Sequence, residues 1–225
     1  MKYQTLIDNV NKLEKKIQRT EPYYFEAIQN LSEVRKDLSK LDIDKHLLRI
    51  VKVFLVKWGE PQIARNVSRP KLNWERLGSV LRNLNKDFME LKDRKFANMN
   101  FDDATISETI KGIYGGIRNS HVERLRGPTI ASMTIHLFNP EVFVMWNYRI
   151  RQSYKKRNFR VCETPEGYLE FLKEAQKEIR EALNDRKKET GRELGEVEKE
   201  IRGRYNNKTL ARIIDEYNHS FQYPD

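Results

Sequence analysis

The stretch that decides the fold is GPTIASMTIHLFNPEVFVMWNYRIRQSYKKRNFR, residues 127–160. It opens on a tight turn at Gly127-Pro128, and the small residues that follow predict a helix at 129–138 that packs closely against a neighbour. The pair Asn139-Pro140 ends that helix, because proline cannot continue it. Residues 141–154 then resume a helical pattern of aromatic and basic side chains. The stretch therefore predicts two helices separated by a short break.

The second half of this stretch combines positive charge with aromatic rings. After Trp146 come six cations and no acid: Arg149, Arg151, Lys155, Lys156, Arg157 and Arg160. The aromatic residues Trp146, Tyr148, Tyr154 and Phe159 are interleaved with them. Such cations, with the N–H groups of a turn, hold phosphates, and exposed rings stack on unpaired bases. The alternative is that Trp146, Ile150 and Tyr154 are core residues at helical spacing while the cations lie in water.

The rest of the chain follows helical patterns as well. Apolar residues at spacings of three and four predict helices at 3–19, 23–41, 73–92, 165–188 and 207–219, and residues 44–58 are apolar on most sides. No stretch shows the alternating pattern of a strand. We therefore expect an all-α protein, either a single domain of 225 residues or two lobes, 1–100 and 101–225.

Local signals mark several helix ends. Asp103 is expected to cap a helix that ends at Gly115-Gly116, and Thr164-Pro165-Glu166 starts another helix with proline at its first position. Residues 59–72 contain Gly59, Pro61 and Arg69-Pro70 and should be irregular, whereas 187–204 forms a hairpin or an exposed helix.

The net charge of +10 is concentrated in the middle of the chain. Between Lys111 and Arg160 there are ten basic residues and two acids, Glu123 and Glu141, which gives +8. This distribution favours an anionic partner more than the global excess does.

The composition also bears on location. One cysteine, Cys162, excludes an internal disulfide framework and a cysteine-rich zinc site, as in a reducing compartment. The first residues lack the apolar segment of a secretory signal, and no stretch has the roughly 20 apolar residues of a membrane span. We expect a cytoplasmic protein with no membrane partner.

The residues of this stretch resemble the distal half of the helix-hairpin-helix DNA glycosylase superfamily. They are more similar still to a group of uncharacterised prokaryotic proteins with the pattern A-S-K-x-L-H-x-x-N-P-x-x-F-x-x-W-D-x-x-I-R. The matching residues are Ala131, Ser132, His136, Asn139, Pro140, Phe143, Trp146, Ile150 and Arg151. The close match covers about 127–219, including GYLEFLKEAQKEI and IIDEYNH. The resemblance implies a helix-hairpin-helix glycosylase-like fold with a cleft that holds DNA.

Two departures from the family concern catalysis. The resemblance places a catalytic aspartate where this chain has Asn147, and an amide cannot stabilise a developing positive charge as a carboxylate does. The lysine of the pattern is Met133, so no Schiff-base nucleophile is assigned. Asn147 is the candidate catalytic position by the resemblance, but if base excision occurs a carboxylate from elsewhere must serve, and the candidates are Asp102, Asp103, Glu123 and Glu141.

Other candidate sites are weaker. The histidines His46, His121, His136 and His219 are scattered and lack metal-site spacing, and we expect neither a metal nor another cofactor. His136 fits a buried core histidine better than a functional one. Cys162 lies close to Arg160 without a histidine partner, and Lys57, Trp58 and Arg65 surround a turn that could border a cleft.

Three functions remain open at this stage. The first is a glycosylase-like protein that binds DNA and extrudes a base, with Trp146, Asn147 and Arg149 lining the cleft and Arg126, Gly127, Arg151, Lys155, Lys156 and Arg157 binding nucleic acid. The second is a DNA- or RNA-binding protein without chemistry, which Asn147 favours. The third is a helical protein-interaction module that uses 1–41 and 165–204.

Overall fold

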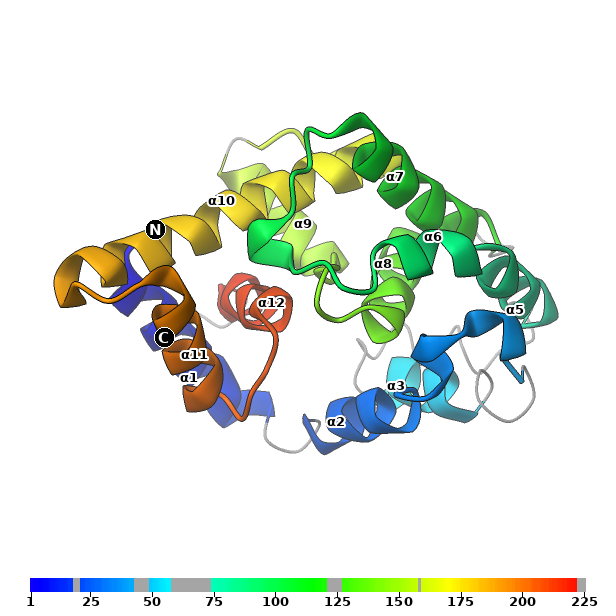
Figure 1. Ribbon diagram of the computed structural model, residues 1–225, viewed down its shortest axis with the longest axis horizontal. Coiled ribbons are helices and arrows are strands. Elements are labelled where there is room, and N and C mark those ends of the chain that lie inside the picture. Colours follow the sequence, from blue (N-terminus) through cyan, green and yellow to red (C-terminus); the bar gives the residue numbers. More distant parts are fainter. Residues whose placement is uncertain (18–20, 43–48, 58–73, 121–126, 158, 222–225) are drawn as a thin grey trace.

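The computed structural model is helical throughout the part that it describes, residues 1–17, 21–42, 49–57, 74–120, 127–157 and 159–221, where no strand occurs. The all-α prediction is therefore confirmed. In Figure 1 the long helix α10 (Pro165–Thr190) runs along one edge of the molecule, with α1 (Tyr3–Ile17), α11 (Leu194–Arg204) and α12 (Leu210–Ser220) gathered at one end. The helices α5 (Trp74–Asn83), α6 (Asn85–Glu90), α7 (Ala104–Asn119) and α8 (Gly127–Phe138) lie toward the other end.

The remaining elements are short. They are α2 (Glu21–Asn30), the 3-10 turns η1 (Val34–Lys36) and η2 (Leu38–Lys40), α3 (Lys52–Lys57), η4 (Phe96–Asn98) and α9 (Tyr148–Lys156).

The first helix packs on the last ones. Its apolar stripe, Leu6, Val10, Leu13 and Ile17, is buried as the spacing predicts, and α1 lies against α12 and α10. One buried core takes residues from both sides of residue 100. The hydrophobic residues at the two ends of the chain thus stabilise the same part of the molecule.

The predicted helix at 23–41 is shorter than expected. Glu21-Pro22 opens α2, but α2 ends at Asn30 and two 3-10 turns replace its continuation. The buried residues are Tyr24, Ala27, Leu31 and Leu38, whereas Phe25 is 37% exposed. The prediction of a single helix over 23–41 is wrong, because the α-helix ends at Asn30 and two 3-10 turns follow it.

Several helix ends agree with the local signals. Asp103 caps α7 by accepting a hydrogen bond from the backbone N–H of Ile106 at 3.0 Å, although α7 continues past Gly115-Gly116 to Asn119. Thr164 caps α10, with Pro165 in its first turn. The region 73–92 forms two helices rather than one, since the chain breaks at Leu84 between α5 and α6. The predicted irregular segment 59–72 lies outside the described residues.

The region predicted as an exposed helix or a hairpin, 187–204, contains both a turn and a helix. α10 ends at Gly191, which adopts a left-handed conformation at φ 70°, and α11 follows. Glycine reaches this conformation at little steric cost, so the turn can be tight.

The segment after α8 is the largest departure from the predicted pattern. Residues 142–146 are fully buried and not helical, and α9 begins only at Tyr148, so the predicted helix at 141–154 is wrong in its first half. An extended chain in the core must find hydrogen-bond partners outside itself. Several of these partners are residues that carry the family resemblance, namely Ser132, His136 and Arg151.

None of the helices in the described part of the chain combines the length and apolar character needed to cross a membrane.

Candidate nucleic-acid interface

The family-like residues hold the buried segment 142–146 in place. Ser132 Oγ accepts a hydrogen bond from the backbone N–H of Trp146 at 2.8 Å, and the His136 ring lies 2.6 Å from the carbonyl oxygen of Phe143. Asn139 donates to the carbonyl oxygen of Leu91 at 3.1 Å. Arg151 donates to the carbonyl oxygen of Trp146 at 2.6 Å. Ser132, His136 and Arg151 thus contact backbone groups of segment 142–146, whereas Asn139 adds a second donor to the carbonyl oxygen of Leu91, which also accepts from the backbone N–H of Arg94. All four side chains therefore stabilise this fold.

Trp146 itself is a core residue. Its side chain has no exposed surface and stacks on Phe171, with ring centroids 5.2 Å apart and an angle of 11° between the planes. Tyr168 lies beside it at 5.8 Å. The expectation that Trp146 lines an open cleft is therefore corrected, because the extended segment carries the indole into the interior.

Asn147 begins α9. Its φ and ψ are −74° and 169°, and its side-chain oxygen accepts a hydrogen bond from the backbone N–H of Ile150 at 2.9 Å. Asparagine is among the favoured residues at this position because it satisfies one of the free N–H groups of the first turn. The residue is 6% exposed. The position at which the resemblance places a catalytic carboxylate is thus occupied by an N-cap.

Two of the six cations of 149–160 are used inside the protein. Arg151 is 3% exposed; besides Trp146, its guanidinium contacts Thr129 Oγ1 at 3.1 Å and Glu163 at 3.0 Å. Its expected role as a contact to phosphate is corrected on this ground, because the guanidinium is buried and already paired.

Arg157 is also tied to the interior. It pairs with Glu178, and its guanidinium lies 4.0 Å from the centre of the Tyr154 ring. Tyr154 donates a hydrogen bond to the other oxygen of Glu178 at 2.7 Å. Burial raises the pKa of Glu178 above its ordinary value, although the guanidinium of Arg157 opposes the shift. About a third of the Arg157 side chain remains exposed, but its charge is already paired with Glu178.

The outward face of α9, unlike its inward face, carries exposed basic side chains. Tyr148 is 56% exposed, and Arg149, Lys155, Lys156 and Arg160 are exposed as well. Since residues seven apart lie two turns apart on the same face of a helix, Tyr148 and Arg149 align with Lys155 and Lys156. Among the described residues, no ion pair joins Lys155, Lys156 or Arg160 to an acid. We call Tyr148, Arg149, Lys155, Lys156 and Arg160 the α9 face.

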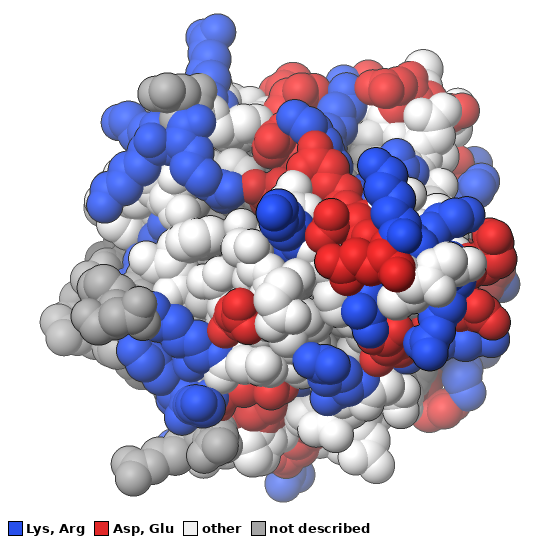
Figure 2. Space-filling model, turned by 90° about the vertical axis from the view of Figure 1, so that its left-hand side faces the viewer, with Lys and Arg blue, Asp and Glu red and all other residues white. Residues whose placement is uncertain are grey.

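On α10 and α11, in contrast, basic side chains form ion pairs with acidic ones. Arg186 and Arg192 both pair with Glu200, at 2.8 and 3.0 Å, and Lys187 pairs with Glu193 at 3.2 Å. Figure 2, which looks onto the end of the molecule with α1, α10 and α11, shows blue and red side chains alternating on its right-hand side. Along the upper left edge of the same view, blue side chains gather with few red neighbours. On this face of the molecule, positive side chains without acidic neighbours therefore gather in particular places and are not spread evenly.

The start of α8 does not offer the expected phosphate site. Gly127 is buried, and a Cβ placed on it would lie 3.3 Å from Cγ of Arg118 and 3.5 Å from the Arg118 carbonyl oxygen. The predicted contact of Gly127 with nucleic acid is corrected, because the chain at Arg118 covers it. Arg126 lies outside the described residues.

The alternative catalytic carboxylates are spread over other parts of the molecule. Asp103 is the cap of α7, Asp102 pairs with Lys173 at 2.9 Å and Glu141 pairs with Arg202 at 3.1 Å. Glu123 lies outside the described residues. None of the three described carboxylates has a contact with Asn147, so the structure brings no acid to that position from this set.

The remaining candidates have ordinary surroundings. Cys162 is partly exposed, and no group of three or more His, Cys, Asp or Glu side chains in the described ranges is placed to hold a metal ion. The Lys57 ammonium lies 5.9 Å from the centre of the Tyr23 ring. His219 is on α12, whereas Trp58, Arg65, His46 and His121 lie outside the described residues.

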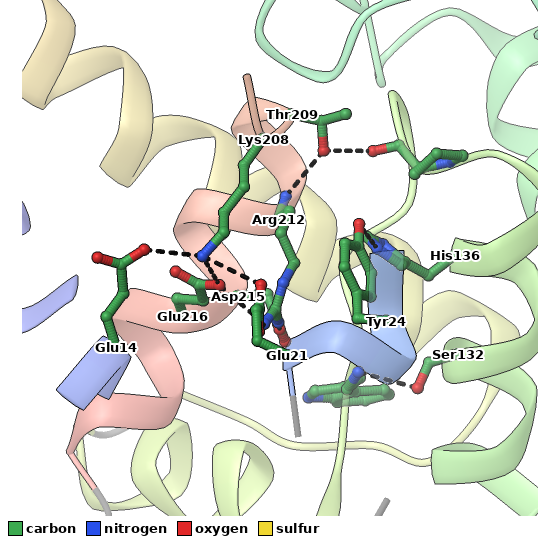
Figure 3. Close-up of polar contacts among 12 residues, drawn as sticks. Glu14, Glu21, Tyr24, Ser132, His136, Lys208, Thr209, Arg212, Asp215 and Glu216 are labelled. Atoms are coloured by element: carbon green, nitrogen blue, oxygen red, sulfur yellow. Dashed lines mark hydrogen bonds and ion pairs between the residues drawn. The ribbon is translucent and has the colours of Figure 1, made fainter. Parts of the chain in front are cut away.

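Sequence reasoning missed a buried ionic cluster between α1, α2 and α12 (Figure 3). Lys208 Nζ lies 2.9 Å from Glu14, 3.1 Å from Glu21 and 2.8 Å from Glu216. Arg212 pairs with Glu21, Asp215 and Glu216 at 2.9, 2.5 and 2.7 Å. We call these six residues the α12 cluster. It holds four carboxylates and two cations.

Two carboxylates of the α12 cluster have raised pKa values. Burial raises the pKa of Asp215 to about 7, although Arg212 opposes the shift, and burial also raises the pKa of Glu216. The Arg212 guanidinium lies 4.7 Å from the centre of the Tyr24 ring, and Tyr24 in turn contacts His136 at 2.9 Å. The cluster is thereby connected to the buried segment 142–146.

The sequence of α12 alone predicts some of the ion pairs of the α12 cluster. Arg212, Asp215 and Glu216 are separated by three and four residues, which places opposite charges side by side on a helix. Their burial could not be read from α12 alone, because Glu14 and Glu21 come from the other end of the chain.

Comparisons with protein-family models, with curated proteins and with solved structures give no match to this chain.

Proposed function

We propose that this protein binds nucleic acid through the α9 face and does not excise a base at Asn147. The observation that carries the proposal is the exposed charge of Lys155, Lys156 and Arg160, which no ion pair among the described residues neutralises, together with the exposed ring of Tyr148 on the same helix as the two lysines. Lysine and arginine attract the phosphate backbone without regard to sequence. A partly exposed tyrosine adds a surface on which an unpaired base can stack.

The dimensions of α9 suit this role. Seven residues of α-helix rise by about 10 Å, which is close to the axial length of three base pairs. The pairs Tyr148–Arg149 and Lys155–Lys156 therefore reach separate phosphates along one strand. The inward residues Ile150, Arg151 and Tyr154 anchor the helix in the core, so the face is presented on a rigid support.

The family resemblance extends the proposal to the fold. We infer that α7 and α8, which pack on one another, are the helix pair of a helix-hairpin-helix glycosylase-like arrangement with lobes 1–100 and 101–225. On this basis DNA is the expected nucleic acid. The single cysteine suits a reducing compartment, and we propose a cytoplasmic location.

The proposal is tested by removing the charge of the α9 face. The variant Lys155→Gln/Lys156→Gln/Arg160→Gln is compared with wild type by fluorescence anisotropy on labelled DNA, as duplex, duplex with an abasic site and single strand, over a series of salt concentrations. We expect affinity at low salt to fall by about tenfold or more, and the dependence of affinity on salt to weaken by two to three released ions, on the order of one per phosphate contact.

The matched control removes the same charge elsewhere. Lys36 and Lys40 have side chains that are 70% and 83% exposed, and Lys188 is exposed on α10. The variant Lys36→Gln/Lys40→Gln/Lys188→Gln should retain nearly all of the wild-type affinity. Equal losses in the two variants would mean that only the global charge matters, and no binding by wild type at low salt would reject the nucleic-acid function.

A further inference from the structure

A pocket of about 470 Å³ lies beside the α12 cluster, between α1, α2 and the turn that precedes α12. Its lining residues are Glu14, Ile17, Glu21, Pro22, Phe25, Asn206 and Lys208. The size is that of a small-molecule site, and the lining combines charged residues with apolar ones, which we call its charged side and its apolar side.

The charged side favours a cation. Lys208 Nζ already donates hydrogen bonds to Glu14 and Glu216 and forms an ion pair with Glu21, so its charge is neutralised inside the protein and does not attract an anion. Glu14 contacts Lys208 through Oε1, and its side chain is 34% exposed. Two carboxylates, Glu14 and Glu21, and a single cation, Lys208, line the pocket, so the lining carries more negative than positive charge.

The apolar side consists of Ile17, Pro22 and Phe25. Phe25 is one of the few large apolar side chains that remain exposed, at 37%, and its ring contacts Tyr24 edge-on with the centroids 5.5 Å apart. A ligand that covers Phe25 would remove this apolar surface from water. An aromatic face close to carboxylates is also a favourable place for an organic ammonium.

We propose that this pocket binds a small aliphatic primary amine. Its ammonium group pairs with Glu14 and lies near Glu21, and its hydrocarbon chain packs against Ile17, Pro22 and Phe25. A neutral apolar molecule would deprive the carboxylates of water without giving them a partner. A bare metal ion is not favoured by the geometry, since no group of three or more His, Cys, Asp or Glu side chains among the described residues is placed to hold one, and the carboxylates of the α12 cluster are paired with Lys208 and Arg212. This site is separate from the α9 face and does not depend on nucleic-acid binding.

The experiment is calorimetric titration of the full chain with n-butylamine and, in parallel, with 1-butanol and with calcium chloride. At about pH 8 the amine carries a proton, while the alcohol has a similar shape and no charge. The variant Glu14→Gln removes the exposed carboxylate, and Phe25→Ala removes the apolar wall. Glu26→Gln is the matched control, because Glu26 is an exposed carboxylate on α2, next to Phe25 in the sequence, that does not line the pocket.

We expect n-butylamine to bind wild type and the Glu26→Gln variant equally, and 1-butanol and calcium to bind at least about tenfold more weakly, as loss of a charge-assisted contact implies. Glu14→Gln and Phe25→Ala should each weaken the amine by about the same factor, with circular dichroism unchanged. Lys208 keeps two carboxylate partners in Glu14→Gln, and Phe25→Ala leaves every charge in place. Equal binding of amine and alcohol, or an amine affinity that both variants leave unchanged, would overturn the proposal.

Discussion

The side-chain oxygen of Asn147 lies 2.9 Å from the backbone nitrogen of Ile150 and closes the first turn of α9. This contact ties the residue at the family's catalytic position to the helix that carries the proposed interface. An aspartate at the same place would cap the helix equally well, so the local geometry accepts either residue.

The first prediction separates these roles. Asn147→Ala should lower the free energy of unfolding by about 1 kcal/mol, because the N–H of Ile150 loses its partner. Asn147→Asp should stay within about 0.5 kcal/mol of wild type, since an acid at a helix N-terminus is favourable. Both values are measured by urea denaturation.

The same Asn147→Asp variant also bears on chemistry. We expect neither wild type nor this variant to release a base from DNA that contains alkylated, deaminated or oxidised bases. Base release by Asn147→Asp alone would show that a complete excision site lacks only its carboxylate, and would contradict our inference that the position is purely structural.

A second prediction distinguishes the buried arginine from the exposed lysine of α9. Arg151→Gln should destabilise the protein by about 2–3 kcal/mol, because the carbonyl of Trp146 and the Glu163 carboxylate lose a donor and packing on Trp146 is lost. Lys155→Gln should change stability by no more than about 0.5 kcal/mol. The unfolding temperatures of both variants measure these effects, and equal changes would mean that the contacts of Arg151 with Trp146 and Glu163 do not stabilise the protein.

A third prediction concerns the exposed ring of Tyr148. Tyr148→Ala should weaken binding to single-stranded DNA by about 1–2 kcal/mol and binding to an intact duplex by less, because only an unpaired base can stack on the ring. Tyr148→Phe serves as the control, since it keeps the ring. A loss of similar size in both variants would assign the effect to the hydroxyl and not to stacking.

A fourth prediction follows from the protonation of Asp215. In the folded protein burial raises its pKa from 3.8 to about 7, so between these pH values the folded state holds a proton that the unfolded chain has released. Ionisation then favours unfolding as the pH rises. The free energy of unfolding of wild type minus that of Asp215→Asn should therefore fall from about pH 4 to about pH 7 and stay constant at higher pH.

Denaturation of the two proteins at several pH values measures this difference. The variant should fold, because Arg212 keeps Glu21 and Glu216 as partners. A difference that rises with pH over the same window would mean that Arg212 stabilises the ionised form of Asp215 more than burial disfavours it.

A fifth prediction concerns His136, whose pKa burial lowers to about 3. The carbonyl oxygen of Phe143 can only accept, so Nδ1 carries the hydrogen, and Nε2 accepts from the hydroxyl of Tyr24. Nitrogen-15 NMR of the imidazole should show this neutral form, without titration, from pH 8 to about pH 4. Its contribution to stability is lost as the pH falls below the ordinary histidine pKa, and a midpoint near that ordinary value would show that the ring is not buried.

The sequence predicts the helices well where the signals are local. Thr164 with Pro165, and Asp103 before α7, are caps whose effect depends on the next three residues only. The prediction fails where distant residues decide. The segment 142–146 continues a helical pattern in the sequence, yet its backbone is not helical: the N–H of Trp146 donates to Ser132, and the carbonyl oxygen of Trp146 accepts from Arg151.

The candidate site shows the same division. Basic and aromatic residues of α9 can be identified from the sequence, but the helical phase that turns Arg151 inward and Lys155 outward depends on where α9 begins. The alternative that Trp146, Ile150 and Tyr154 are core residues is confirmed, since all three are buried. The burial of Arg151 could not be predicted, because its partners Thr129 and Glu163 lie outside α9. The α12 cluster was missed because Glu21 and Arg212 meet only in the folded chain.

The packing of α1 on α12 has a consequence for biosynthesis. Glu14 and Lys208 are 194 residues apart, and translation at about 5–20 residues per second separates their appearance by roughly 10–40 seconds. Throughout that delay the nascent chain carries the apolar stripe of α1 without the helix that covers it. α12, which leaves the ribosome well after α1, thus completes the core around it, and general chaperones that shield hydrophobic nascent segments can act in this interval.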